Sequence, residues 1–260
     1  MSIQYENFKK ECATEISSQA NDPGLQAMTQ AWMNCANKLK YSYHFESLGR
    51  PIIQYPQDVI AMQELIWQVK PDLIIETGIA HGGSLILNAS MLALLDICDA
   101  IENGISMDPK ISKRKVLGID IDIRPHNRDH IESHPMASRI QMIQGSSIEP
   151  KIIDQVKEMA KDYKTILVSL DSNHTHEHVL EELEAYAPLT SVNSYCVVFD
   201  SIIEDMPAEM FPDRPWGPGN NPKTALKEYI AKHPEFEIDK SIQNKLLITV
   251  APDGYLKRVR

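Results

Sequence analysis

Acidic side chains follow several short apolar runs of this sequence. Four of them come directly after such a run: Glu76, Asp120, Asp171 and Asp200. Carboxylates that lie close together repel one another unless a cation lies between them, and oxygen ligands are those that Mg²⁺ prefers. His174 stands three positions after Asp171, and histidine is a common general base for removing a proton from a hydroxyl group. This combination predicts metal-assisted chemistry on a hydroxyl group.

The metal site is expected at Asp171 and Asp200, with Ser201 as a further oxygen ligand. In the alternative interpretation, these acids only cap the helices that follow them. His176 and His178 continue an alternating series of histidines, but no cysteine accompanies them, so zinc is disfavoured. A non-haem iron site, with two histidines and one carboxylate on one face of the metal, is a weaker rival.

A glycine-rich segment separates the first apolar run from a long apolar stretch. This segment, residues 76–84, holds three of the eleven glycines of the chain. Glycines gathered there predict a tight turn that brings the backbone close to a ligand, and the helix that follows offers free amide groups. The residues expected to contact a cofactor are Glu76, Thr77, Gly78, His81, Gly82, Gly83 and Ser84.

The chemistry of the cofactor can be narrowed from the acids around this segment. The glycines do not form the G-x-G-x-x-G pattern of dinucleotide-binding proteins. Asp120 is placed to accept both hydroxyl groups of a ribose, and Ile121, Gly145 and Ser146 are expected beside it. Because like charges repel, an acidic pocket favours an amino group and a positive sulfur over a pyrophosphate. S-adenosylmethionine fits this description.

The elements that position these residues are predicted from the apolar runs themselves. Continuous rather than alternating apolar residues are typical of strands that are buried on both faces of a parallel sheet. Such strands alternate here with helical segments, which predicts an α/β fold with a doubly wound, mostly parallel sheet. Ligands bind at the carboxyl ends of such strands. The runs lie at residues 73–75, 116–119, 140–143, 165–170, 195–199 and 246–250.

Composition excludes several classes of protein. The 260 residues carry a net charge of −10, and 43% of them are hydrophobic, which is typical of a globular protein and disfavours nucleic acid as a partner. Four separated cysteines, without a C-x-x-C pair, indicate reduced thiols in the cytoplasm. The N-terminus lacks the pattern of a secretory signal. The longest apolar stretch, residues 84–97, is shorter than the roughly 18 residues of a membrane span, so a buried helix is expected.

Three stretches of the sequence resemble a known family: residues 71–84, 118–124 and 171–178. They resemble the cephalosporin hydroxylase family, which is similar to class I S-adenosylmethionine-dependent methyltransferases and is related to metal-dependent macrolide-sugar O-methyltransferases. The likeness extends from about residue 49 to the C-terminus. It implies a Rossmann-like class I methyltransferase fold with an antiparallel C-terminal strand.

The resemblance also implies roles for particular residues. His174 matches the position of the catalytic base in the sugar-methylating relatives. Those relatives commonly have a glutamate just before the second aspartate, where this chain has Phe199, so one ligand fewer is available to an ion. The residues that would line the cofactor pocket are Glu76, Gly78, His81, Gly82, Ser84, Asp120 and Ser146.

Two parts of the chain are expected around this core. Residues 1–70, with helical stretches at 27–39 and 58–68, form an N-terminal helical cap, and residues 71–260 form the S-adenosylmethionine-binding methyltransferase domain. Residues 206–221 are too rich in proline and glycine for a regular element, and they are expected to form a substrate loop or a contact in an oligomer. The residues expected to contact the substrate are Tyr55, Arg214, Trp216 and Asn221.

These observations predict an S-adenosylmethionine-dependent, Mg²⁺-assisted O-methyltransferase. The expected acceptor is a hydroxyl group of a sugar, in a polysaccharide or a secondary-metabolite glycoside, followed by a catechol-like diol. The expected partners are this small molecule or glycan and further copies of the same chain, without nucleic acid or a membrane span. Two alternatives stay open: an NAD-binding oxidoreductase or hydroxylase-type tailoring enzyme, and a non-catalytic protein that binds cofactor or sugar.

Overall fold

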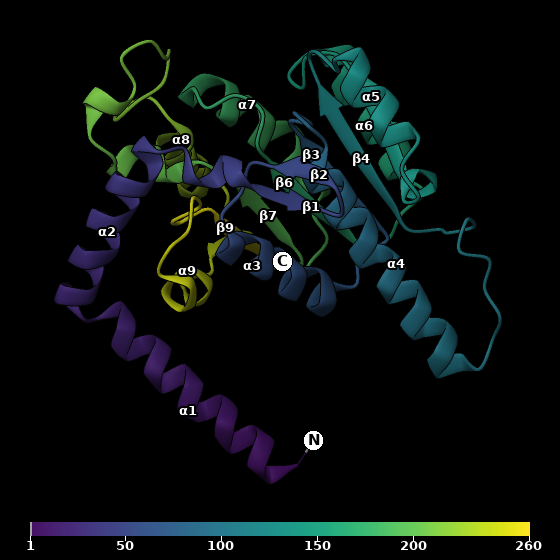
Figure 1. Ribbon diagram of the computed structural model, residues 1–260, viewed down its shortest axis with the longest axis horizontal. Coiled ribbons are helices and arrows are strands. Elements are labelled where there is room, and N and C mark those ends of the chain that lie inside the picture. Colours follow the sequence, from purple (N-terminus) through teal and green to yellow (C-terminus); the bar gives the residue numbers. More distant parts are fainter. Residues whose placement is uncertain (1) are drawn as a thin grey trace.

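The computed structural model describes residues 2–260, which fold around a seven-stranded sheet with helices on both faces (Figure 1). The strand order is β5-β4-β3-β6-β7-β9-β8. The first five of these strands are parallel, and β9 is antiparallel to both of its neighbours. The strands are β3 (Leu73–Thr77), β4 (Lys115–Asp120), β5 (Ile140–Gln144), β6 (Ile166–Leu170), β7 (Tyr195–Val198), β8 (Phe236–Ile238) and β9 (Tyr255–Arg258).

Both faces of the sheet are buried, which explains the continuous apolar runs. Successive side chains of a strand point to opposite faces. Accordingly, Ile74 of β3 packs in one apolar cluster, while Leu73 and Ile75 pack in the other. All five residues of β3 and of β6 are buried.

Helices cover each face of the sheet (Figure 1). The first cluster includes residues from α3 (Pro56–Val69), α4 (Gly83–Asn103), α5 (Pro125–Glu132) and α9 (Lys240–Leu246). The second includes residues from α6 (Pro150–Ala160), α7 (His176–Tyr186) and α8 (Pro222–Lys232). The doubly wound α/β fold with an antiparallel C-terminal strand is therefore confirmed.

The N-terminal part projects away from the sheet in Figure 1. Helix α1 (Ile3–Ala20) has no buried residue, and α2 (Pro23–Lys38) has only Met33. A two-stranded sheet of β1 (Phe45–Ser47) and β2 (Arg50–Ile52) then leads into α3. Helix α3 contributes buried residues to the first cluster, so it packs with the sheet although it precedes residue 70. The division of the chain into two domains at residue 70 stays a prediction.

Most of the expected elements are present, and one is not. The strands expected between residues 73 and 199 and the helices expected at 27–39 and 58–68 are confirmed. The strand expected at 246–250 is wrong, because α9 ends at Leu246 and the next residues are irregular. Buried contacts hold this segment instead: Asp58 accepts hydrogen bonds from the Thr249 hydroxyl and the Val250 amide.

The long apolar stretch forms α4, which has the length and hydropathy of a membrane span. However, 44% of the residues in its most apolar window are buried inside the fold. Leu85, Leu92 and Leu95 are fully enclosed in the cluster between this helix and the sheet. Packing of this kind is typical of a core helix.

Candidate active site

The site lies where the strand order reverses, at the carboxyl ends of β3 and β6. In doubly wound sheets this switch point is the usual place for a ligand. Gly78, directly after β3, has a φ of +89°, and a Cβ atom there would lie 2.0 Å from the Asp171 carbonyl oxygen. Only glycine fits such a position, so the glycine loop approaches the end of β6 closely.

Asp120 holds the glycine loop in place. Its Oδ2 atom accepts hydrogen bonds from the amides of Ile79 (2.8 Å) and Ala80 (3.2 Å), and its Oδ1 atom accepts one from the Asp122 amide (2.9 Å). A carboxylate oxygen accepts more than one hydrogen bond, so Asp120 retains capacity for the hydroxyl groups of a ligand. The bonds to the loop are a second role, which the sequence did not predict.

A first pocket, of about 140 Å³, lies beside Asp120. Of the residues expected at the cofactor, Gly78, Asp120, Ile121 and Ser146 line it. Gly145 supports this pocket from outside, because its amide donates to the Asp120 carbonyl group (2.9 Å). Five further lining residues were not expected there: Ile119, Ser147, Ser172, Asn173 and His178. From the sequence, His178, which lies in α7, was considered only as a possible zinc ligand.

A second pocket, of about 210 Å³, continues from the first, since both are lined by Gly78 and Ser172. Expected cofactor residues line it: His81, Gly83 and Ser84. Gly82 is the N-cap of α4, and Thr77 is buried, with its hydroxyl oxygen accepting from the Asp171 amide (3.3 Å). The two pockets are therefore neighbours, and residues of the glycine loop line both.

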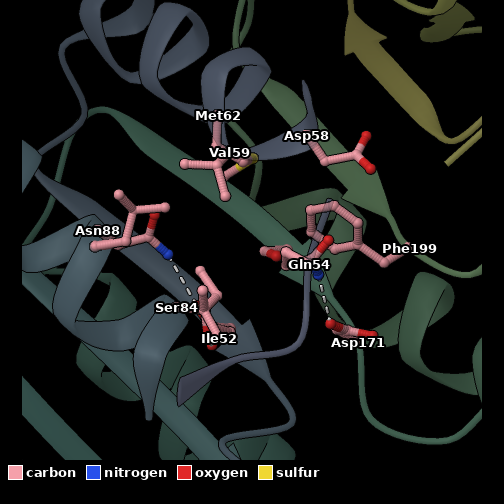
Figure 2. A pocket seen from close by; sticks show the side chains of 12 residues that line it. Ile52, Gln54, Asp58, Val59, Met62, Ser84, Asn88, Asp171 and Phe199 are labelled. Carbon is pink, nitrogen blue, oxygen red and sulfur yellow. Dashed lines mark hydrogen bonds between the residues drawn. The ribbon is translucent and has the colours of Figure 1, made fainter. Parts of the chain in front are cut away.

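Glu76 lies behind these two pockets rather than in them. Its carboxylate is buried and accepts hydrogen bonds from the Ser84 hydroxyl and from Asn88 Nδ2 (2.9 Å). Burial raises the pKa of Glu76 to about 7, and the two hydrogen bonds offset part of this rise. It lines a small inner cavity that Asp171 and Phe199 also line (Figure 2).

Asp171, His174 and Asp200 lie close together in the lining of the second pocket. One potential ligand atom from each lies within 4.8 Å of the others. His174 Nε2 is 3.1 Å from Asp200 Oδ2. Burial raises the pKa of Asp171 well above its usual range, and the charges of Asp200 and Glu76 raise it further. A divalent cation removes this conflict, and two carboxylates are an adequate donor set for Mg²⁺.

Two residues of the expected metal region are directed elsewhere. The Ser201 hydroxyl is buried and donates to the Pro252 carbonyl oxygen (2.6 Å), so it is already engaged. Phe199 is buried, and its ring borders the inner cavity next to Asp171 (Figure 2). The residue that lies with Asp171 and Asp200 is thus His174, and not Ser201 as the sequence predicted.

A third pocket, of about 270 Å³, adjoins this cluster, and both His174 and Asp200 line it. Two of the expected substrate residues, Arg214 and Trp216, line it as well. The Trp216 ring meets the His174 ring edge-on, with centroids 4.9 Å apart, and the Arg214 guanidinium lies 5.1 Å from the centre of the Trp216 ring. Lys40, which follows α2, lines this pocket too.

Tyr55 and Asn221, also expected at the substrate, lie in structural positions. Tyr55 is fully buried, and its hydroxyl donates to Asn37. Asn221 is the buried N-cap of α8, where it accepts from the amides of Lys223 and Thr224. Gln54, next to Tyr55, lines the second pocket instead.

Comparison with known proteins places the chain in a family. Residues 39–259 match the model of the Rhamnosyl O-methyltransferase/CmcI family. The chain belongs to this family. Membership confirms the expected class of enzyme, an S-adenosylmethionine-dependent O-methyltransferase.

Several members of the family are similar over most of their length. The Rhamnosyl O-methyltransferase of Mycobacterium tuberculosis is 30% identical over 206 residues, which are 77% of this chain and 73% of that protein. The one from Mycobacterium leprae is 27% identical over 215 residues, 81% of this chain and 82% of that protein. A CmcI structure described with Mg and SAM shares the fold, with a TM-score of 0.52 and 17% identity, covering 84% of this chain and 78% of that one.

Proposed function

We propose that the chain transfers the methyl group of S-adenosylmethionine to a hydroxyl group of a sugar, with Mg²⁺ held by Asp171 and Asp200. The observation that carries this proposal is the order of the three pockets. Two of them meet at Gly78 and Ser172, and the second and third meet at His174 and Asp200. The first two accommodate an extended cofactor, and the third accommodates an acceptor next to the acidic cluster.

The first pocket suits the nucleoside part of the cofactor. Asp120 is placed to accept from ribose hydroxyl groups, while Ile121, which is 72% exposed at the mouth, offers an apolar surface to a base. The polar second pocket, next to the start of α4, suits the amino-acid part. The resemblance to methyltransferases supports this orientation.

The residues of the cluster then divide the chemistry. When bound, S-adenosylmethionine supplies an electrophilic methyl group, and Mg²⁺ supplies positive charge next to the acceptor oxygen. Asp171, which lines the second pocket, and Asp200, which lines the second and the third, would hold that charge. Much of the rate enhancement would come from fixing the acceptor in line with the methyl group.

His174 is placed to take the proton of the acceptor hydroxyl. It lines both the second and the third pocket, so its ring faces the boundary that the methyl group must cross. Contact with Asp200 at Nε2 favours the tautomer with a proton on that nitrogen, which leaves Nδ1 free to act as the base. Trp216 packs against the ring edge and restrains its orientation.

The third pocket supports a sugar as the acceptor. Trp216 offers an aromatic face, and Ile202, Met206 and Phe211 form an apolar floor. The Rhamnosyl O-methyltransferases of the mycobacteria support a rhamnosyl group as the first acceptor to test.

Methyl transfer is tested with radiolabelled S-adenosylmethionine and a panel of rhamnosides and other glycosides. We expect label to enter at least one glycoside in the presence of Mg²⁺ and not in the presence of EDTA. Calorimetric titration with S-adenosylhomocysteine and with NAD tests the cofactor separately. Binding of NAD without binding of S-adenosylhomocysteine would contradict the proposal.

We also propose that the enzyme works in the cytoplasm as a homo-oligomer. Four free cysteines support a reducing compartment. The apolar side chains that α1 and α2 expose, such as Phe8 (59%) and Met28 (65%), support contacts with a second copy. Light scattering of the purified chain at several concentrations measures the oligomeric state, and a monomer at every concentration would contradict this part.

A further inference from the structure

Gln54 touches Asp171 from a distant part of the chain. It lies just before α3, and its side chain is only 7% exposed. Its Nε2 atom donates a 3.0 Å hydrogen bond to Asp171 Oδ2, as Figure 2 shows. Gln54 lines both the second pocket and the inner cavity of about 20 Å³ behind it. Gln54 therefore connects the segment before α3 to the acidic cluster.

Among residues 2–260, Gln54 is the one side chain that donates a hydrogen bond to the Asp171 carboxylate. The charged groups that act on it, Asp200, Glu76 and Glu182, are acids and have no proton to donate when ionised. With Oδ2 bound to Gln54, the orientation of the carboxylate is restrained and Oδ1 stays free. A restrained ligand binds a cation with less loss of conformational freedom.

The oxygen atom of the Gln54 amide lowers the stability of the fold. Its Oε1 atom is buried, and it has no hydrogen-bond partner in the part of the chain that the structure describes. A buried oxygen in this state destabilises a fold by about 1–3 kcal/mol. A methionine or leucine of similar volume would avoid this penalty. The stability of the fold therefore does not explain a glutamine at this position, whereas a donor to Asp171 does.

We propose that Gln54 is a positioning residue for the cation site, which holds the Asp171 carboxylate in the orientation that binds the ion. The inference rests on the proposed function. It connects α3 to the chemistry, because this helix is itself fixed to the C-terminal segment through Asp58, which the Val250 amide and the Tyr255 hydroxyl contact. A change in the position of α3 would then move Gln54 and alter the affinity of the Asp171 site for the ion.

The test measures the affinity for Mn²⁺, as a paramagnetic substitute for Mg²⁺, by electron paramagnetic resonance in the presence of S-adenosylhomocysteine. No acceptor is needed. We expect Gln54→Met to weaken Mn²⁺ binding about tenfold, as the loss of a partner that orients a metal ligand commonly does. The variant removes both the unpartnered oxygen and the donor to Asp171, and these two effects on stability oppose each other, so its Tm should stay close to that of the unchanged protein. A merely structural residue would show the opposite pattern.

Controls separate this inference from the proposed function. Gln63→Met makes the same change at an exposed position of α3 and should alter neither quantity. Gln54→Leu serves as a second variant if Gln54→Met does not fold. In an Asp171→Ala background, Gln54→Met should have no further effect on the ion, because the group that it orients is gone.

Each outcome has one meaning. If the unchanged protein binds no Mn²⁺, the metal-assisted function fails. If it does bind the ion, and both Gln54 variants bind it equally well, only the inference about Gln54 fails. If the variants weaken binding of S-adenosylhomocysteine and leave that of Mn²⁺ unchanged, Gln54 is a cofactor ligand and the inference is overturned.

Discussion

Asp58 is a buried acid and Asp171 is a half-buried one, and their surroundings differ. Asp58 accepts hydrogen bonds from the Thr249 hydroxyl, the Val250 amide (3.0 Å) and the Tyr255 hydroxyl (2.8 Å). Among residues 2–260, the side chain of Asp171 accepts one, from Gln54, and Asp200 lies nearby. A carboxylate with enough donors fixes two segments of the chain together. One with few donors and an acidic neighbour is a poor structural contact and a suitable ligand for a cation, and this is the contrast between the two acids.

Removing the carboxylate of Asp171 should have the largest effect on activity. Asp171→Asn keeps the shape of the side chain but removes its charge, so methyl transfer should fall on the order of 10³-fold, since Lewis-acid assistance contributes several kcal/mol. Stability should not fall, because repulsion between two acids is relieved. The rate of label transfer and the Tm check the two statements. If the variant keeps activity within a factor of about ten of the unchanged enzyme, Asp171 has no chemical role that sets it apart from Asp58.

Removing the charge of Asp58 should have the opposite pattern. Asp58→Asn turns an amide donor toward groups that are themselves donors, so the free energy of unfolding should fall by about 1–3 kcal/mol. Activity per folded molecule should stay close to normal. Urea unfolding followed by circular dichroism measures the loss. Thr249→Val, which removes one of the donors, should lower stability in the same direction, and an unchanged midpoint in both variants would show that this network is unimportant.

The dependence of stability on pH sharpens the comparison further. Burial raises the pKa of Asp58 to about 6 and that of Glu76 to about 7, above the values of the unfolded chain. The folded protein therefore binds more protons than the unfolded chain between about pH 4 and 7. In metal-free buffer its stability should fall as the pH rises through this window, by up to about 1.4 kcal/mol per pH unit for each group.

Glu76→Gln isolates one of these two groups. The variant should lose the part of the slope that lies between about pH 4.5 and 7 and should keep the part due to Asp58. Unfolding curves at several pH values measure both slopes. A stability that rises with pH over this range would reverse the sign of the argument.

The smallest effect is expected in the third pocket. Trp216→Ala should raise the KM for the sugar about tenfold, because a stacking surface is lost, and should leave the affinity for Mn²⁺ unchanged. Trp67→Ala, at a half-exposed position of α3 outside the three pockets, is the matched control. Equal kinetics for the two variants would show that the acceptor binds elsewhere.

The sequence was informative where local pattern decides structure. Apolar runs such as 165–170 predicted strands, because burial on both faces of a sheet requires continuous hydrophobicity, and the observed strand is Ile166–Leu170. The acids that end these strands meet in space because the carboxyl ends of parallel strands share one edge of the sheet. For the same reason Asp171 and Asp200 could be placed together from the sequence alone.

Contacts between distant segments could not be predicted in this way. The apolar run at 246–250 follows the pattern of a strand, but hydrogen bonds to Asp58, nearly 200 residues away in the sequence, hold it as an irregular segment. The hydroxyl of Ser201 and the amide of Asn221 look like free ligands in the sequence, yet they bind the Pro252 carbonyl and the backbone of α8. Gln54 carries no motif at all, and only the fold brings it to Asp171.

The central claim is that an ion lies between the cofactor and the acceptor, held by Asp171 and Asp200. A crystal grown with S-adenosylhomocysteine and Mn²⁺, measured at a wavelength where manganese scatters anomalously, tests it most directly. The account predicts one strong anomalous peak between these two carboxylates, with the nucleoside next to Ile121 and Ser146. A nucleoside in that pocket with no peak at the carboxylates, or a peak at another site, would contradict it.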